Sequence, residues 1–314
     1  MVGIGTGPVH VLGRAGMDFY AEPAGTAVAQ AEGFFACLGG SAGNIAAGLA
    51  RQGRAAALIS AVSDDAVGRF VLAELRRYGV GSAHVAVKGG ATRTSLAVTE
   101  TRGAPETVIY RNGAADLMLE AEDLAGIDWA ASGGLIVTGT ALAAEPSRGA
   151  ALAAMQAARD TGRAVVLDVD YRPYSWRSEV EAAEVCRSAA ALCSLVVGND
   201  EEWAVMAGGE GLSLARATGR DRVAIYKKGA EGCETFLPGR DFRTGIFAVT
   251  ALKPMGAGDG FMAGLIAGLA EGGTMEEAVE RGAAAAALVV SSKGCAPAMP
   301  TAAELEAFLA ERRR

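Results

Sequence analysis

Residues 253–261 read "KPMGAGDGF", and they place three small residues, Gly256, Ala257 and Gly258, directly before the carboxylate of Asp259. The stretch "FMAGLIAGLAEGG" (261–273) that follows is apolar around its whole surface and ends in glycines, which predicts a buried helix. Backbone N–H groups at a helix N-terminus are unpaired and favour an anion. The stretch therefore predicts an anion-binding turn beside a carboxylate. The alternative is a left-handed turn that Asp259 merely caps.

Composition limits the class of protein. The chain has 314 residues, of which 51% are apolar, so it can bury one large α/β core or two smaller ones. A net charge of −7 and the lack of a basic block argue against nucleic-acid binding. No secretory signal and no apolar run of membrane-spanning length is visible, so we expect a soluble, cytoplasmic protein with no membrane partner.

Cysteine and histidine usage excludes several chemistries. The five cysteines form no CxxC pair, which favours buried free thiols over metal ligands. The two histidines, His10 and His84, lie far from the glycine-rich segments in the sequence, so a Ser-His-Asp triad is not expected. Any catalysis must then come from carboxylates, lysines, arginines and backbone amides.

Short β-rich runs alternate with helical stretches along most of the chain. The strands are nearly continuous runs of apolar residues, as expected for strands that are buried on both faces. With helices between them, they predict a parallel, doubly wound α/β sheet. The expected strands are 9–13, 56–62, 135–139, 164–170, 194–200 and 222–228, and the expected helices include 44–53, 64–79 and 147–161.

Two segments, 15–38 and 91–112, do not follow this alternation. The second is typical of a β-hairpin with a Gly-Ala-Pro turn at 103–105. We expect the two segments to form a small sheet outside the main one. The alternative is a pair of long irregular loops, which are uncommon in compact domains.

Polar residues stand where several expected strands end. In an open parallel sheet, ligands bind in the crevice outside the carboxyl ends of the strands. A series of polar strand ends therefore indicates a site there. The series comprises Asp18, Asp168, Asp170, Asn199, Lys227 and Lys228.

A second glycine segment, "GGSAGN" (39–44), leads directly into a helix. Gly39 and Gly40 would let a ligand approach the backbone, and Asn44 would form a hydrogen bond to it. The alternative is a hinge with Asn44 as helix N-cap. The segment also suggests an NAD-dependent dehydrogenase, but the G-x-G-x-x-G spacing is absent, and so is the P-loop motif of ordinary nucleotide kinases.

Together, "GGSAGNIAAGLARQG" (39–53) and "KPMGAGDGFMAGL" (253–265) resemble the two signatures of the ribokinase-like (PfkB) carbohydrate kinase family, with "NDEE" and "KKGAEG" between them. The resemblance spans essentially the whole chain. It implies a Rossmann-like fold with a β-sheet lid from 15–38 and 91–112, as one kinase domain over 1–314. It also implies that Asp259 is the catalytic base and that the amides of 256–258 surround the transferred phosphoryl group.

Further stretches, among them "YRNGAADLMLE" (110–120) and "LDVDYRPYSW" (167–176), are similar to kinases of keto sugar acids. This implies ATP-dependent phosphorylation of the terminal hydroxyl, with 5-dehydro-2-deoxy-D-gluconate of inositol catabolism converted to its 6-phosphate; 2-keto-3-deoxygluconate or another sugar is the alternative. Arg111 and Arg172 would meet the carboxylate, and a neutral sugar would leave both unpaired. The implied substrate-binding residues are Asp18, Gly39, Gly40, Asn44, Tyr110, Arg111, Asp170 and Arg172.

The resemblance also implies a nucleotide site and its ions. Mg²⁺ would accompany ATP, with Glu202 reaching it through water. Ribokinase carries an Asp where this chain has Lys253, in a segment that helps to bind a monovalent cation, which argues against activation by K⁺. The implied nucleotide-binding residues are Asn199, Lys227, Lys228, Gly229 and Gly232, with Lys227 the more direct contact of the two lysines.

A ligand sensor without turnover is a further alternative, which an intact Asp259 disfavours because a sensor needs no base. Members of the family often pair through their lids, so we expect a homodimer.

Overall fold

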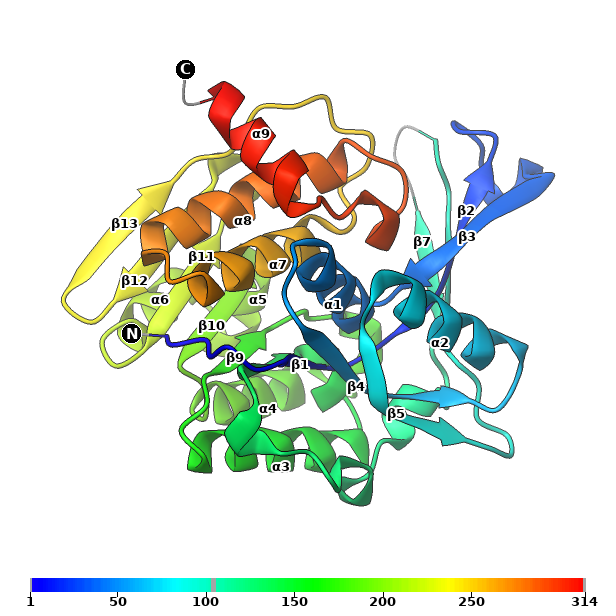
Figure 1. Cartoon of the computed structure of the whole chain (residues 1–314), viewed down its shortest axis with the longest axis horizontal. Coiled ribbons are helices and arrows are strands. Elements are labelled where there is room, and N and C mark those ends of the chain that lie inside the picture. The colour runs from blue at the N-terminus through cyan, green and yellow to red at the C-terminus, as the bar shows by residue number, and fades with distance from the viewer. Residues whose placement is uncertain (1, 103–105, 313–314) are drawn as a thin grey trace.

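The computed structural model describes residues 2–102 and 106–312, and it consists of a large twisted sheet between two layers of helices, with a smaller sheet at one end (Figure 1). The large sheet has the strand order β13-β12-β11-β10-β9-β8-β1-β4-β5. All neighbours from β11 to β5 pair in parallel. Its strands are β1 (Val9–Leu12), β4 (Ala56–Ser63), β5 (Gly81–Lys88), β8 (Gly134–Thr138), β9 (Val165–Asp168), β10 (Leu195–Asn199), β11 (Val223–Lys227), β12 (Cys233–Leu237) and β13 (Arg240–Thr244). The predicted doubly wound, mostly parallel sheet is therefore confirmed.

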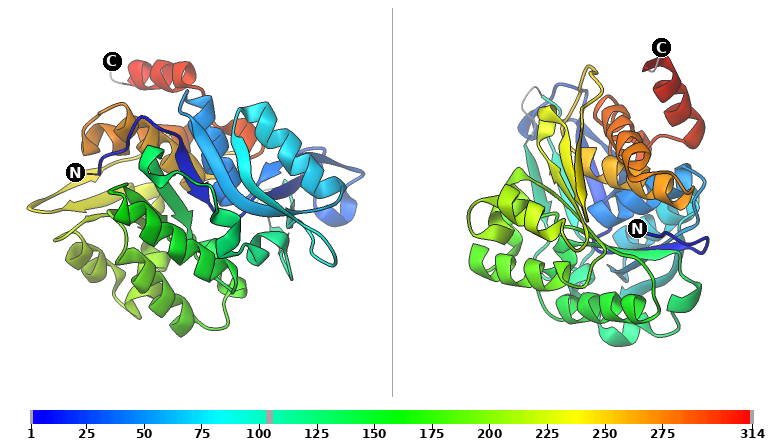
Figure 2. Two further views of the ribbon diagram at one scale, coloured as in Figure 1. Left: turned by 60° about the horizontal axis from the view of Figure 1, so that its bottom comes forward. Right: turned by 90° about the vertical axis from the view of Figure 1, so that its left-hand side faces the viewer.

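Helices cover both faces of this sheet, as Figure 2 shows. One apolar core joins the sheet to α1 (Ser41–Arg51), α2 (Ala66–Tyr78), α7 (Ala257–Ala270) and α8 (Met275–Val290). The core of the opposite face joins it to α3 (Ser147–Asp160), α4 (Glu179–Ala190), α5 (Asp200–Ala207) and α6 (Gly211–Thr218). The last helix, α9 (Ala302–Arg312), packs on α8 rather than on the sheet. Central strands are thus buried on both sides, which explains their nearly continuous apolar sequences.

The small sheet is built from the two segments that break the alternation. Its strand order is β3-β2-β6-β7, with β2 (Gly16–Glu22), β3 (Gly33–Gly39), β6 (Leu96–Thr99) and β7 (Thr107–Tyr110). β6 and β7 pair antiparallel, as expected for the hairpin, and the predicted turn at 103–105 lies outside the described residues. The expectation of a separate small sheet is confirmed, and the alternative of irregular loops is wrong.

The edge formed by β12 and β13 departs from the parallel pattern, because both strands pair antiparallel. A two-residue connection between β12 and β13 leaves no room for a crossover helix, so only a hairpin is possible. β13 lies at the edge and exposes Arg240 and Arg243, charged side chains that discourage pairing with another chain.

All five cysteines are buried and free, as expected from their sequence context. Within the described part of the chain, no helix combines the length and the apolar character needed to cross a bilayer.

The position of α7 depends on glycines that face α8. A Cβ atom at Gly264 would lie 2.7 Å from the carbonyl oxygen of Arg281 and 3.0 Å from the Ala285 Cβ. A Cβ atom at Gly268 would lie 3.0 Å from the Cα of Ala278. The absence of side chains at these positions lets the two helices pack with their backbones close together. This contact fixes the axis along which the N-terminus of α7 points.

We predict that Gly264→Val lowers the free energy of unfolding by about 1–3 kcal/mol or more, because the added side chain forces α7 away from α8. Chemical denaturation of both proteins measures the difference. Gly89→Val is the matched control, since Gly89 is exposed and a Cβ atom there meets nothing within 4 Å. Equal loss of stability in the two variants would show that the α7–α8 contact is not tightly packed.

Candidate active site

A cavity of about 240 Å³ lies between the carboxyl ends of the central strands, the N-termini of α1 and α7, and the small sheet. It is therefore at the edge of the sheet where polar strand ends predicted a site. Its walls carry side chains from elements more than 200 residues apart in the sequence. They are Arg14, Asp18, Tyr20, Gly40, Ser41, Asn44, Ala97, Thr99, Thr107, Ile109, Arg111, Thr140, Arg172, Tyr174, Ser175, Met255, Gly256, Asp259 and Cys295.

The N-terminus of α7 presents Asp259 to this cavity. Gly256 is the N-cap, with φ +83°, and a Cβ atom there would lie 2.9 Å from the Cys295 Sγ. The turn therefore requires glycine both for its backbone conformation and because there is no space for a side chain. Asp259 lies in the first turn and does not cap the helix, so the alternative of an Asp259-capped turn is wrong. Its Oδ2 accepts a hydrogen bond of 2.7 Å from Asn44 Nδ2.

Burial and the nearby Asp170 raise the pKa of Asp259 to about 6, although the Asn44 hydrogen bond, Arg172 and Lys227 work in the opposite direction. The carboxyl group is thus ionised at neutral pH but is a stronger base than an exposed aspartate. A pKa just below neutrality suits a group that must accept a proton.

The second glycine segment forms the N-terminus of α1. Gly40 is its N-cap, with φ +87°, and a Cβ atom at Gly39 would lie 1.9 Å from Asp18 Oδ1. Gly39 is therefore needed where the Asp18 carboxylate packs against the backbone. Asn44 lies within the helix, so the alternative that it serves as N-cap is wrong.

Several buried polar atoms of the cavity have no hydrogen-bond partner within the protein. Asp18 Oδ1 and Asn44 Oδ1 are unpaired acceptors, and Arg111 Nη1 is an unpaired donor. Leaving such atoms unpaired is costly unless a ligand or water pairs them. Burial raises the pKa of Asp18, against the opposing charges of Arg14 and Lys253. Together these atoms suit a small ligand with several hydroxyl groups.

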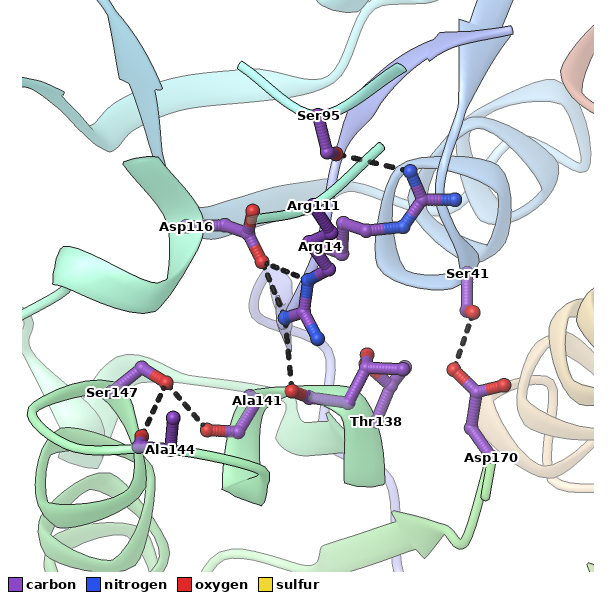
Figure 3. A network of polar contacts seen from close by, with 11 residues as sticks. Arg14, Ser41, Ser95, Arg111, Asp116, Thr138, Ala141, Ala144, Ser147 and Asp170 are labelled. Carbon is purple, nitrogen blue, oxygen red and sulfur yellow. Dashed lines mark hydrogen bonds and ion pairs between the residues drawn. The ribbon is translucent and has the colours of Figure 1, made fainter. Parts of the chain in front are cut away.

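Arg111 and Arg172 both line the cavity, but each already has a carboxylate partner; Figure 3 shows the pair that Arg111 forms with Asp116. Arg111 Nη2 lies 2.5 Å from Asp116 Oδ2 and also donates to the carbonyl of Thr140. Arg172 Nη2 lies 2.7 Å from Asp170 Oδ1. The premise that a neutral ligand would leave both guanidinium groups unpaired is therefore wrong.

Asp170 itself is held in an unusual backbone conformation at the end of β9. Its φ is +38°, in the region that favours glycine, and its Oδ2 accepts a hydrogen bond of 2.5 Å from Ser41 Oγ. The Arg172 ion pair and the Ser41 hydrogen bond together stabilise this conformation. Asp170 thereby links the end of β9 to the N-terminus of α1.

Tyr110 does not fit the substrate role expected for it. Its side chain is 60% exposed and is absent from the cavity wall. Side chains alternate along β7, so Ile109 faces the cavity whereas Tyr110 points to the other face of the small sheet.

Of the two lysines that end β11, only Lys227 points toward the carboxylates at the strand ends. A Cβ atom at Gly258 would lie 3.4 Å from its Nζ. Burial tends to lower the pKa of Lys227, but Asp168, Glu202 and other carboxylates raise it overall, so the side chain stays cationic. Lys228 instead forms ion pairs with Glu231 and Glu234. The Lys227 ammonium group therefore lies beside the N-terminus of α7, whereas that of Lys228 pairs with nearby glutamates.

Asn199 and Glu202 form a reciprocal cap at the start of α5. Glu202 N–H donates to Asn199 Oδ1 at 2.8 Å, and Asn199 N–H donates to Glu202 Oε2 at 2.7 Å. The other oxygen of Glu202 accepts from Tyr171 N–H. Both oxygens of this buried carboxylate thus accept a backbone hydrogen bond, which fixes its orientation. Among the residues described, no cluster of three metal-ligating side chains occurs.

The loop after β11 contains both predicted glycines. Gly229 has φ +55°, and Gly232 has φ +82° with the Thr244 carbonyl oxygen 2.1 Å from where a Cβ atom would be. Both positions require glycine for the backbone, which leaves the loop surface free of side chains there.

Lys253 lies directly behind the glycine turn and is buried. Its Nζ donates to the carbonyl oxygens of Met255 at 2.6 Å and Val289 at 3.2 Å. The first precedes the N-terminus of α7, and the second is in the last turn of α8. Burial lowers the pKa of Lys253, while Cys295, Asp259 and Asp18 work against this shift.

Sequence reasoning missed several polar residues of the cavity wall, among them Arg14 and Ser41. Arg14 follows β1 as Asp170 follows β9, so the strand-end pattern that identified the others also contained the signal for it. Ser41 lies inside a glycine segment that was considered for its backbone alone.

Comparison with known proteins identifies the family of this chain. A family model described as pfkB family carbohydrate kinase matches residues 8–302. A 5-dehydro-2-deoxygluconokinase from Photobacterium profundum is 43% identical over 312 residues, covering 96% of this chain and 94% of the relative.

Two crystal structures have similar folds. A PfkB protein from Polaromonas is 28% identical with a TM-score of 0.83, covering 96% of this chain and 99% of that one. A fructokinase from Vibrio cholerae, in a form with fructose, ADP and potassium bound, is 25% identical with a TM-score of 0.85, covering 97% and 99%. The family match over nearly the whole length confirms the ribokinase-like fold and excludes the dehydrogenase and sensor alternatives. The chain belongs to the pfkB family of carbohydrate kinases.

Proposed function

We propose that this kinase phosphorylates the terminal hydroxyl of 5-dehydro-2-deoxy-D-gluconate to give the 6-phosphate, with ATP as the phosphoryl donor. The observation that carries the proposal is Asp259, held by Asn44 at the N-terminus of α7 and facing a cavity with arginines in its wall. The similarity to 5-dehydro-2-deoxygluconokinase supports this substrate over 2-keto-3-deoxygluconate or a neutral sugar.

Asp259 acts as the general base. Its Oδ2 is oriented by Asn44 Nδ2, and burial makes it basic enough to take the proton of the attacking hydroxyl. Phosphoryl transfer needs this proton acceptor late, because bond formation to the nucleophile lags behind bond breaking in a loose transition state.

Positive charge for the transferred group comes from two sources in the chain. The unpaired N–H groups at Ala257 and Gly258 begin α7, and the Lys227 ammonium lies beside them. Such preorganised donors stabilise charge that develops on equatorial oxygens. When bound, ATP supplies the phosphoryl group and Mg²⁺ neutralises part of its charge.

The nucleotide would lie along the ends of β10 and β11, against Asn199, Lys227, Gly229 and Gly232, with Glu202 contacting Mg²⁺ through water. The two glycines of the loop and the inward-pointing Lys227 support this assignment, whereas the ion pairs of Lys228 favour a supporting role for it. Asp18, Gly39, Gly40 and Asn44 would hold the sugar hydroxyls, because two of them present unpaired acceptors.

We further propose that residues 1–314 act as one kinase domain, in which 15–38 and 91–112 close over the substrate as a lid. The outer face of the small sheet exposes Phe34, Val108 and Tyr110, which suits a homodimer formed through that face. Free thiols and the use of ATP fit a cytoplasmic enzyme.

Lys253 bears on the role of K⁺, which the related fructokinase structure contains. Lys253 lies in the segment expected to help bind a monovalent cation, and its ammonium group occupies the position between the Met255 and Val289 carbonyls. A second cation there would face electrostatic repulsion. The residues present therefore do not fit a K⁺ ion at this place, and we propose that Lys253 replaces it.

Asp259→Asn should lower turnover by a factor on the order of 10² or more, because the amide cannot accept the proton, while binding of ATP and sugar acid stays nearly unchanged. Steady-state kinetics and isothermal titration calorimetry measure the two effects. Near-normal turnover would show that Asp259 is not the base.

The pH dependence of turnover should show an acidic limb near pH 6. Below the raised pKa of about 6 the carboxyl group holds a proton and cannot accept another, so kcat falls as the pH drops through this value. Residual turnover of Asp259→Asn should lack that limb. A limb near pH 4 in the unmodified enzyme would contradict the role given to burial.

The rate of the unmodified enzyme should be the same within about twofold in K⁺ and in Na⁺, because Lys253 supplies the charge internally. Lys253→Ala should lower kcat about tenfold or more, and K⁺ or NH₄⁺ should restore part of it by filling the vacated position. Lys293→Ala, which removes an exposed lysine, is the control. An unmodified enzyme that needs K⁺ for turnover would refute the replacement.

A further inference from the structure

Of the three arginines in the cavity wall, Arg14 is the one without an ion-pair partner among the residues that the structure describes. It follows β1, its side chain is buried, and it lines the cavity. Its Nη1 donates a hydrogen bond of 3.0 Å to Ser95 Oγ, which is a neutral acceptor. Among residues 2–102 and 106–312, no carboxylate oxygen lies within 4.0 Å of its guanidinium nitrogens. Figure 3 shows Arg14 directed toward Ser95, away from Asp116.

The two other arginines of the cavity differ in this respect. Arg111 is neutralised by Asp116, and Arg172 by Asp170. Their partners come from neighbouring sequence, five and two residues away, so each pair forms as the local chain folds. Asp18 lies only four residues from Arg14, yet it forms no ion pair with it, so the charge of Arg14 remains available to a ligand.

The nearest candidate for an internal counter-ion is Asp18, which also lines the cavity. The charge of Arg14 acts on the pKa of Asp18, yet the two groups do not close into an ion pair. Asp18 Oδ1 stays without any partner. Both groups are thus kept apart within one cavity, as expected if a ligand with an anionic end and a hydroxyl comes between them.

A buried cation without a counter-ion destabilises a protein, so a fold retains one where a ligand supplies the opposite charge. A guanidinium group offers two parallel donors to a carboxylate, and Ser95 occupies only one of the five donors of Arg14.

We propose that Arg14 binds the carboxylate of the substrate and is the main determinant of the preference for a sugar acid over a neutral sugar. Arg111 adds its unpaired Nη1 to the same wall, whereas Arg172 chiefly holds Asp170 in place. This inference rests on the proposed function, since it takes the substrate to be a keto sugar acid.

The test compares two substrates in four proteins. The substrates are 5-dehydro-2-deoxy-D-gluconate and its analogue with CH₂OH in place of the carboxylate. The proteins are the unmodified enzyme, Arg14→Gln, Arg172→Gln and the control Arg163→Gln. Gln keeps a donor for Ser95 but removes the charge. Arg163 precedes β9 at the opposite edge of the sheet, far from the strand end that carries Asp168.

For Arg14→Gln we expect the ratio of kcat/KM between acid and neutral analogue to fall about tenfold or more, mainly through KM for the acid, with KM for ATP unchanged. Arg163→Gln should keep the ratio of the unmodified enzyme, and Arg172→Gln should change it less than Arg14→Gln does. A ratio that survives in Arg14→Gln but collapses in Arg172→Gln overturns the assignment to Arg14.

Two further measurements keep the outcome unambiguous. If the unmodified enzyme does not prefer the acid, the proposed function fails before Arg14 is considered. If Arg14→Gln does not fold, as judged by its thermal unfolding, Arg14→Lys takes its place. It keeps the charge but loses the two-donor geometry, so KM for the acid should rise while KM for the neutral analogue stays constant. No change in either KM would refute the proposal.

Discussion

The constraint on which this structure depends is the burial of several carboxylates at one edge of the sheet. Asp168, Asp170, Glu202 and Asp259 come together there, and Lys227 is a cation that acts on all four. Burial raises the pKa of Asp168 and of Glu202, and Lys227 opposes both shifts. Without cations in fixed positions, the carboxylates at this edge would repel one another. The balance of charge at this edge therefore depends on the ends of β9, β10, β11 and α7 keeping fixed positions relative to one another.

The packing of α7 against α8 helps to keep the end of α7 in its position. Gly264 and Gly268 let α7 lie close against α8, and Gly256 lets the chain turn tightly behind the helix N-terminus. Lys253 then joins the carbonyl before α7 to one in the last turn of α8. The Asp259 carboxylate is thus carried on a helix whose start is held by a buried ammonium group and whose axis is held by backbone contact with α8. Neither constraint depends on the substrate.

Much of this could be predicted from the sequence, for definite physical reasons. Apolar runs that end in Asp168 or Asn199 predict strands buried on both faces, and the glycines before Asp259 predict a helix start, which lines the cavity in the structure. Which charged side chains form ion pairs could not be predicted in the same way. Whether Arg111 is free depends on Asp116, which a short 3₁₀ turn brings back toward it. Tyr110 and Arg111 are neighbours in sequence, yet Tyr110 ends β7 with an exposed side chain, whereas Arg111, directly after the strand, lines the cavity.

The buried polar atoms of the cavity that lack partners destabilise the free enzyme. A ligand that pairs them removes this cost. Asp18 Oδ1, Asn44 Oδ1 and Arg111 Nη1 are buried without partners, while Asp170 is held at positive φ. Such features destabilise a fold and persist only where packing enforces them. Gly39 is part of that enforcement, since any side chain there would displace the Asp18 carboxylate. Because a ligand that pairs these atoms binds the folded state alone, its binding energy also stabilises the arrangement of β2, α1 and α7 around it. Ligand binding and folding stability are therefore coupled through these unpaired atoms.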